Sequence, residues 1–216
     1  THALTGALVG AGLCADAGNV EWSRLGSAFA LPLFLAPMLA IVIGAVLYRV
    51  MRPLGLVPDH RTRLLDALHY VSAGAVSFAR GMNDTPKMAA LLGGVAVVSG
   101  SWSFGIIAVA MTAGGIISAR RVAETLAHKI TDMNPGQGLV ANITTAGLVI
   151  LGSVQGLPLS TTHVTVGSLL GIGITTNQAK WKTIVPVLLA WVITLPCAAL
   201  LAAITFALGR FFLPVR

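Results

Sequence analysis

The sequence predicts an all-α, polytopic membrane protein, and three observations support this fold class. First, 56% of the 216 residues are hydrophobic and 10% are charged, with 24 glycines and a mean hydropathy of +0.86. Water-soluble domains carry far more charge than this. Second, several apolar runs have the length of a membrane span. Third, a glycine-rich polar motif occurs twice, which indicates an internal repeat.

Two apolar runs are long enough to cross a bilayer core of about 30 Å as helices. They cover residues 26–48, where no charge interrupts the run, and residues 183–208. Two further runs, at residues 104–118 and 139–154, are shorter or more polar. These cross only if flanking residues or neighbouring protein complete them. The apolar stretches on either side of Gly81 are each nearer to half a span than to a whole one.

The repeated motif covers residues 162–173 and residues 1–12, which share a Thr-His pair and four later positions. Each copy is followed by a tryptophan and, fifteen residues after it, by a proline inside an apolar run: Trp22 with Pro37, and Trp181 with Pro196. Polar repeats among membrane spans are typical of a transporter with a binding site where the repeats meet. We expect a first repeat that starts part-way through, and Thr1 not to be the natural beginning of the protein.

The formal net charge of +7 comes mainly from junctions between apolar runs. Basic residues beside spans report topology, so the arginine-rich segment at residues 49–63 is the best candidate for a cytoplasmic loop. No nucleic-acid partner is expected from this distribution. The two cysteines, Cys14 and Cys197, lie in or beside apolar sequence, and neither a disulfide nor a metal-binding framework follows from them.

A short polar island lies between apolar flanks near the middle of the chain. It holds Arg80, Asp84 and Lys87 within eight residues. Ionisable side chains at membrane depth are costly, and by default they indicate a functional site. Gly81 and Pro86 predict a break in the helix here, which would free N–H groups for an anion and C=O groups for a cation.

The island also contains Asn83, which can both donate and accept hydrogen bonds, whereas an ionised Asp84 only accepts them. Asp84 would therefore favour a coupling cation or a protonated oxygen of a substrate. The alternative interpretation is an interfacial loop in which Arg80 and Lys87 extend their charged ends to water.

A second polar island, at residues 156–163, places three hydroxyl side chains just after Pro158: Ser160, Thr161 and Thr162. Proline suits the first turn of a helix, so these hydroxyls and the unpaired N–H groups of the helix start form a candidate anion site. The alternative is ordinary capping by Ser160 or Thr161, which does not exclude binding by the neighbouring hydroxyls.

His163 and His2 hold the same position in the two copies of the motif. A histidine in an apolar helix more often packs through hydrogen bonds than carries a proton, but the imidazole leaves a gating or proton-coupling role open. The glycines that follow are expected to let helices approach closely: Gly167, Gly171 and Gly173 in one copy, Gly6, Gly10 and Gly12 in the other.

The two islands together resemble the signatures of the PiT-type inorganic phosphate transporters, also classed as phosphate/sulfate permeases. The sequence GMNDTPK at residues 81–87 is followed downstream by GLPLSTTHVTVGSLLGIG at residues 156–173, and the stretch between them at 120–138 is similar as well. The resemblance covers essentially the whole chain, and its C-terminal part holds the second signature repeat. It implies an inverted-repeat secondary transporter with broken or re-entrant helices, in which phosphate uptake is coupled to sodium or protons.

By position, the family's signatures fall on the two islands and on the first residues of the chain. The resemblance thus implies substrate binding by Asn83, Ser160, Thr161, Thr162, Thr1 and Lys87. It implies a coupling-ion site at Asp84 and Asn83, with sodium at Asp84 as the candidate metal, and gating or packing by His163 and His2. Lys87 departs from many phosphate members, and it either raises affinity for an anion or marks another substrate.

This organisation divides the chain into three parts. Residues 1–50 are the end of the first repeat, residues 51–63 are a basic, cytoplasmic loop, and residues 64–216 are the second repeat with both signature motifs. The expected setting is a bacterial or archaeal plasma membrane, with inorganic phosphate or sulfate as the partner. No cofactor is expected besides a coupling cation of sodium or a proton, and a homodimer is compatible with the resemblance.

We expect cation-coupled phosphate transport by alternating access, and no enzymatic activity. A sulfate or other oxyanion permease is the alternative, which the sequence does not separate from the first. An intramembrane hydrolase using Asp84 and His163 is less well supported, because no second catalytic acid accompanies them. A non-transporting membrane scaffold would have no need of such costly polar islands.

Overall fold

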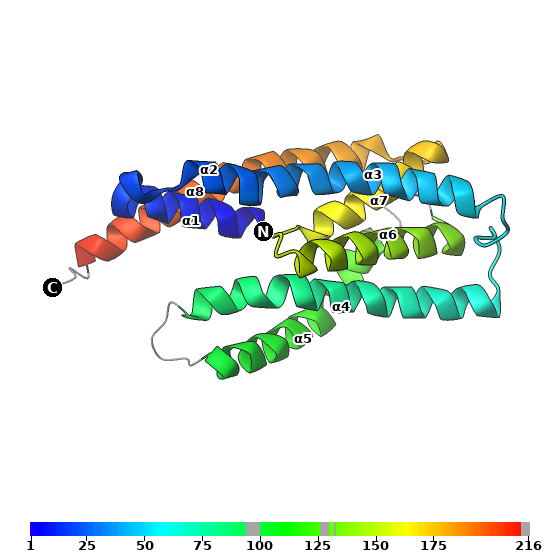
Figure 1. The fold of residues 1–216 in the computed structure, drawn as a ribbon, viewed down its shortest axis with the longest axis horizontal. Coiled ribbons are helices and arrows are strands. Elements are labelled where there is room, and N and C mark those ends of the chain that lie inside the picture. The colour runs from blue at the N-terminus through cyan, green and yellow to red at the C-terminus, as the bar shows by residue number, and fades with distance from the viewer. Residues whose placement is uncertain (94–99, 126–129, 132, 213–216) are drawn as a thin grey trace. The chain divides into compact units, whose positions relative to one another are not determined.

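The computed structural model describes residues 1–93, 100–125, 130–131 and 133–212 (Figure 1). Apart from an isolated bridge between Thr131 and Ala179, the regular structure in these ranges is helical. The predicted all-α fold is therefore confirmed. The chain divides into a central unit, Leu33–Lys180, and a terminal unit made of Thr1–Pro32 and Trp181–Arg216. The predicted division into repeats concerns internal symmetry, and it stays a prediction.

The terminal unit is built from the two ends of the chain. Its helices are α1 (His2–Asp16), the 3-10 turn η1 (Ala17–Asn19), α2 (Trp22–Leu25), the π-helical turn η2 (Gly26–Ala30) and α8 (Trp181–Phe212). Helix α1 packs along α8. Two close approaches define this packing, because a Cβ atom added at Gly6 would meet the backbone of Leu195 and one added at Gly10 would meet that of Ala199.

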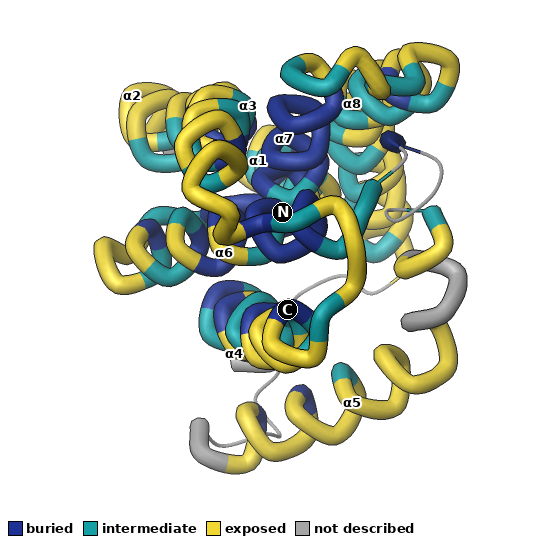
Figure 2. The backbone as a smooth tube through the Cα atoms, turned by 90° about the vertical axis from the view of Figure 1, so that its right-hand side faces the viewer, coloured by how far each residue is buried: buried dark blue, intermediate teal, exposed yellow. Residues whose placement is uncertain are grey.

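The central unit contains the five remaining helices of the described chain. They are α3 (Leu31–Met51), α4 (Arg63–Gly93), α5 (Gly100–Glu124), α6 (Pro135–Val154) and α7 (Thr161–Thr175). Helix α4 packs against both α5 and α6, and α6 packs against α7 (Figure 1). Helix α7 is the most buried of these helices, as the colouring in Figure 2 shows.

Small residues bring α7 and α3 together within the central unit. A Cβ atom at Gly167 would lie 2.6 Å from the carbonyl oxygen of Pro37, and one at Gly171 would collide with the backbone of Ile41. In return, a Cβ at Gly44 of α3 would lie 2.9 Å from the carbonyl oxygen of Ser168. The close helix packing predicted for Gly167 and Gly171 is confirmed, because each contact requires the absence of a side chain. Gly173 approaches Thr131 and Ala179 instead of a neighbouring helix.

The same pattern of contacts appears for both copies of the repeated motif. Helices α1 and α7, which carry the copies, each contain 15 residues. Gly6 and Gly10 of α1 pack on α8, the proline-containing helix that follows the second copy. Gly167 and Gly171 of α7 pack on α3, the proline-containing helix that follows the first. Each short helix thus packs against the long helix that follows the other copy of the motif. For this reason the terminal unit combines the first and last segments of the chain.

Three helical stretches are long and apolar enough to cross a membrane: Trp22–Met51, Pro135–Val154 and Trp181–Phe212. The first and third confirm the spans predicted at residues 26–48 and 183–208. The second shows that the run at 139–154, which the sequence left conditional, is completed to the length of a span by the residues before it. The apolar part of α5, Trp102–Ser118, is shorter than a span by length and composition. The chain is therefore a multi-pass integral membrane protein.

The predicted break at Gly81 and Pro86 is wrong, because both residues lie inside α4, which continues for 31 residues. Pro86 has no N–H, so the carbonyl of Met82 loses its usual helical partner, but membrane helices tolerate this loss. The proline ring is also on an exposed position, where it displaces no packed neighbour. The segment is not the interfacial loop of the alternative interpretation either.

The helical structure is instead interrupted between α6, which ends at Val154, and α7, which begins at Thr161. Gly156 adopts a positive φ of 71°, and its N–H donates to the carbonyl of Ser153 at 3.0 Å. The next N–H, of Leu157, donates to the carbonyl of Gly152 at 2.9 Å, which completes a Schellman motif. Pro158 lies in this connection and does not start α7, which begins at Thr161.

We predict that Gly171→Ala destabilises the protein by about 1–3 kcal/mol, because the new methyl group would overlap the backbone of α3. Gly147→Ala is the matched control, since a Cβ atom there meets nothing within 4 Å and alanine favours a helix. Thermal unfolding of both variants in detergent, followed by size-exclusion chromatography, measures the difference. Equal midpoints for the two variants would contradict the close packing of α7 on α3.

Candidate functional site

The first polar island presents its polar side chains on one side of α4. Three of them follow Arg80 at helix-face spacings: Asn83 by three positions, Asp84 by four and Lys87 by seven. Residues at these spacings lie on the same face of a helix. Asn83 is buried with 4% exposure, and the side chains of Asp84 and Lys87 retain 19% and 16% exposure. Arg80 is more open, with 52% of its side chain exposed. The charge cluster is therefore partly desolvated at its Lys87 end.

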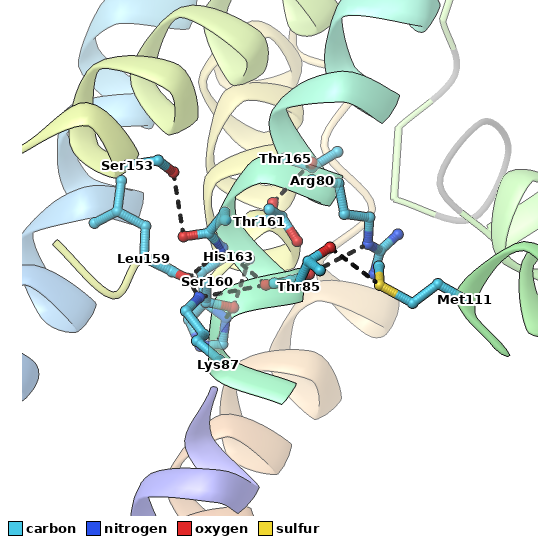
Figure 3. A network of polar contacts seen from close by, with 12 residues as sticks. Arg80, Thr85, Lys87, Met111, Ser153, Leu159, Ser160, Thr161, His163 and Thr165 are labelled. Atoms are coloured by element: carbon cyan, nitrogen blue, oxygen red, sulfur yellow. Dashed lines mark hydrogen bonds and ion pairs between the residues drawn. The ribbon is translucent and has the colours of Figure 1, made fainter. Parts of the chain in front are cut away.

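The connection between α6 and α7 receives two of these side chains. The amide nitrogen of Asn83 donates to the backbone carbonyl of Leu159 at 2.9 Å, and the ammonium nitrogen of Lys87 donates to the same oxygen at 2.6 Å (Figure 3). Leu159 lies between α6 and α7, outside both helices. Its oxygen has two lone pairs, and the two donors of α4 satisfy both.

The carboxylate of Asp84 lies between two cations on the same helix. Its Oδ1 is 3.3 Å from the Lys87 ammonium nitrogen and accepts a hydrogen bond from the Asn83 amide at 2.8 Å. Its Oδ2 is 3.7 Å from Nε of Arg80. Two positive groups and one negative group leave one net positive charge on this face of α4.

The amide of Asn83 is held in one orientation by its partners. Its nitrogen donates to Leu159 and Asp84, while its oxygen accepts a hydrogen bond from the hydroxyl of Ser153 at 3.4 Å. Ser153 lies in the last turn of α6. Both donors and the acceptor of the amide are thus used, so the side chain links α4 to α6 and to the connection that follows.

The second polar island forms the start of α7. Ser160 is the N-cap, and its hydroxyl accepts a hydrogen bond from the backbone N–H of His163 at 3.4 Å. The same hydroxyl shares a hydrogen bond with Nδ1 of His163 at 2.6 Å. The capping expected of Ser160 is therefore present, and the hydrogen-bonded packing expected of His163 is present too.

The structure separates the hydroxyl residues that follow. Ser160 and Thr161 are buried, with 8% and 7% exposure, whereas Thr162 is exposed. Ser160 directly follows Leu159, so the start of α7 adjoins the charged face of α4. The structure brings together Asn83, Asp84 and Lys87 with this helix start. Thr1 and His2 belong to the terminal unit, where Thr1 is the N-cap of α1, and the role predicted for them stays a prediction.

Two participants were not identified in the sequence. One is the carbonyl of Leu159, a backbone group that no residue type marks. The other is Ser153, whose only signal is a hydroxyl residue three positions before the helix-ending Gly156. Two other polar residues of α6 have different partners: Asn142 donates to Ser72 at 3.1 Å, and Thr145 shares a hydrogen bond with Ser168 at 3.2 Å.

A separate polar cavity of about 350 Å³ lies at the other end of α6 and α7. It is lined by Tyr48, Arg52, Asp59, Asn134, Gln137, Thr175, Thr176 and Gln178. Here Asn134 and Gln137 form a capping box at the start of α6, and Arg52 lies 3.8 Å from Asp59. Among the described residues no group of three His, Cys, Asp or Glu side chains could hold a metal ion, so a cation at Asp84 would also need backbone or amide oxygens.

Comparison with known sequences identifies the family of the chain. Residues 1–202 match the model of the phosphate transporter family. The chain belongs to this family. No solved structure matches it.

Curated relatives in bacteria carry names of the same kind. A protein of Mycobacterium bovis named "Probable low-affinity inorganic phosphate transporter" is 34% identical over 98% of this chain and 54% of its own length. A protein of Bacillus subtilis with the same name is 29% identical over 95% of the chain and 66% of its own length. A "Putative phosphate permease" of Mycobacterium tuberculosis is 39% identical over 61% of the chain and 24% of its own length. The chain thus spans about half the length of the first of these relatives.

We predict that Asn83→Leu loosens the connection between α6 and α7, because the carbonyl of Leu159 loses one of its two donors and the hydroxyl of Ser153 loses its acceptor. The loss of a buried hydrogen bond costs about 1–3 kcal/mol, so the amide hydrogens of Leu157 and Leu159 should exchange about tenfold faster or more. Hydrogen–deuterium exchange with mass spectrometry measures this.

Ser77→Ala is the matched control for this measurement. The Ser77 hydroxyl donates to the carbonyl of Ala73 within α4 and lies on an exposed position of that helix. Its loss should leave exchange in the connection unchanged. Unaltered exchange in the Asn83→Leu variant would contradict the role of the Asn83 amide in holding the connection.

Proposed function

We propose that the complete protein containing this chain carries inorganic phosphate across a membrane. The observation that carries the proposal is the charged face of α4, with one net positive charge, held by Asn83 and Lys87 directly beside the start of α7. Family membership and the names of the relatives point to the same substrate.

The chemistry of the site suits an oxyanion that must bind and leave again. A helix start favours negative charge through its unpaired N–H groups, and hydroxyl side chains there add further donors. The amide of Asn83 would supply such a donor by giving up its hydrogen bond to Leu159 or Asp84, and the hydroxyls at the start of α7 supply others near the ammonium group of Lys87. The positive charge of that group is partly offset by Asp84, 3.3 Å away, which limits how tightly an anion would be held.

We also propose that transport is coupled to a cation and that Asp84 is the residue through which coupling acts. An ionised carboxylate in a partly buried site attracts a cation or a proton, and the bound positive charge offsets the charge of phosphate during transport. Sodium and the proton are the two candidates.

Alternating access would use the paired arrangement of the motif helices. Each of α1 and α7 is locked by glycine contacts to one long helix, so each pair is suited to move as a rigid body. In transporters that work by alternating access, the site opens to one side of the membrane at a time. The inverted symmetry that this scheme requires is a further part of the proposal.

We predict that Asp84→Asn abolishes coupled phosphate uptake by the complete protein without preventing its insertion into the membrane. The reason is that the carboxylate charge is removed while the size of the side chain is kept. Uptake of radiolabelled phosphate into proteoliposomes, with and without sodium or proton gradients, measures the effect.

Asp66→Asn is the matched control, because it makes the same change near the start of α4, where Asp66 pairs with Arg61 at 3.2 Å. Its uptake should equal that of the wild type. Normal gradient-dependent uptake by the Asp84→Asn protein would disprove the role proposed for Asp84.

A competition experiment with unlabelled anions distinguishes a phosphate transporter from a sulfate permease. Sulfate has the same tetrahedral arrangement of acceptor oxygens as phosphate, but near neutral pH it has no proton to donate to Asp84. We expect an excess of unlabelled phosphate to suppress the uptake of labelled phosphate, and an equal excess of sulfate to leave most of it. Stronger suppression by sulfate than by phosphate would make the protein a sulfate permease instead.

A further inference from the structure

The connection between α6 and α7 places oxygen atoms where a transporter would bind a cation. In discontinuous transporter helices, backbone carbonyls of unwound segments coordinate sodium or protons together with nearby polar groups. The carbonyl of Leu159 is such a group, since it lies in the non-helical connection between α6 and α7. Asp84 provides a carboxylate beside it, because Asn83 and Lys87 each bridge the two groups.

Lys87 already fills the position between these oxygen atoms. Its ammonium nitrogen is 2.6 Å from the oxygen of Leu159 and 3.3 Å from Oδ1 of Asp84. The Leu159 oxygen also accepts from Asn83, so both of its lone pairs are in use. The Oδ1 atom of Asp84 likewise has two donors. These oxygen atoms have no lone pair left for a further cation while Lys87 stays in place.

We propose that the ammonium group of Lys87 takes the place of a sodium ion beside Asp84, so that phosphate transport by the complete protein is independent of sodium. This inference rests on the proposed function, which it narrows by removing one of the two candidate coupling ions.

Electrostatics supports the exclusion of sodium. A second unit charge about 4 Å from the ammonium group would be repelled strongly enough to weaken its binding by about a thousandfold at an effective dielectric constant of about 20. The side chain of Lys87 is also largely shielded, with 16% exposure, which limits screening by water and salt.

The net charge of the site also supports the replacement of a sodium ion by Lys87. With Arg80, Asp84 and Lys87 in place, the site has one net positive charge. A Lys87→Gln variant would have a net charge of zero, and a bound sodium ion would restore the positive charge that favours phosphate. Glutamine can still approach the carbonyl of Leu159 through its amide, but it leaves a lone pair of Asp84 open to the ion.

The experiment compares phosphate uptake by the complete wild-type protein and by Lys87→Gln in proteoliposomes. Each is assayed with sodium and with potassium as the external cation, at equal ionic strength and equal pH. We expect the wild type to take up phosphate equally in both salts. The Lys87→Gln protein should be impaired in potassium and stimulated several-fold by sodium.

Lys182→Gln is the matched control. Lys182 lies on an exposed position near the start of α8, so the variant removes the same charge from a residue that takes no part in the contacts of the site. It should behave as the wild type does in both salts.

A second measurement tests the cation position without transport. Thermal unfolding of the purified proteins is compared in sodium chloride and potassium chloride. A ligand that binds the folded state raises the unfolding midpoint, so sodium should selectively stabilise Lys87→Gln and leave the wild type and Lys182→Gln unaffected. This result supports the inference even if the Lys87→Gln protein takes up no phosphate.

The outcomes separate the inference from the proposed function. Wild-type uptake that requires sodium overturns the inference and leaves phosphate transport intact. The same holds if sodium neither stimulates nor stabilises the Lys87→Gln protein. Absence of phosphate uptake by the wild type in either salt overturns the proposed function, and the unfolding measurement then decides whether Lys87 occupies a cation position.

Discussion

The central unit depends on one backbone oxygen, the carbonyl of Leu159. Two side chains of α4, Asn83 and Lys87, donate to it at 2.9 and 2.6 Å, and they connect that helix to the start of α7. A buried hydrogen bond to a charged donor contributes about 1.5–3 kcal/mol, more than a neutral one. Without this acceptor, the buried amide of Asn83 and the ammonium group of Lys87 would each lose a hydrogen-bond partner. The interaction therefore both stabilises the packing of α4 and locates the charge cluster.

The glycines of α7 supply a complementary constraint, because they fix that helix against α3. A helix that approaches the backbone of its neighbour this closely has little freedom to shift along it, and the helix start that it carries is correspondingly fixed. Ser160 completes the arrangement by capping the helix and bonding to His163. The donors at the start of α7 are thus preorganised, which would reduce the entropy lost on binding the anion that the proposed function places there.

The sequence was sufficient for features that depend on composition and on local chemistry. Apolar length predicted two of the three spans, and the hydroxyl run predicted the cap at Ser160. It failed at Pro86, because proline reports the loss of one N–H but not whether the neighbouring turns compensate for it. It also missed Leu159, since a backbone carbonyl carries no residue signature and becomes distinctive only when the chain around it leaves the helix. Both the continuity of α4 at Pro86 and the role of the Leu159 carbonyl depend on contacts between residues that are distant in the sequence.

A lysine and a free ion solve the same electrostatic problem with different thermodynamic consequences. Either one can offset the carboxylate of Asp84 and keep the site attractive to an anion. A free ion, however, crosses the membrane with the substrate and transfers the free energy of its own gradient to transport. In the proposed transporter, the ammonium group of Lys87 is covalently bound to α4 and would return with it in every cycle, so it would change affinity without contributing a driving force. A protein built this way must obtain coupling energy from a different ion or run down the phosphate gradient itself.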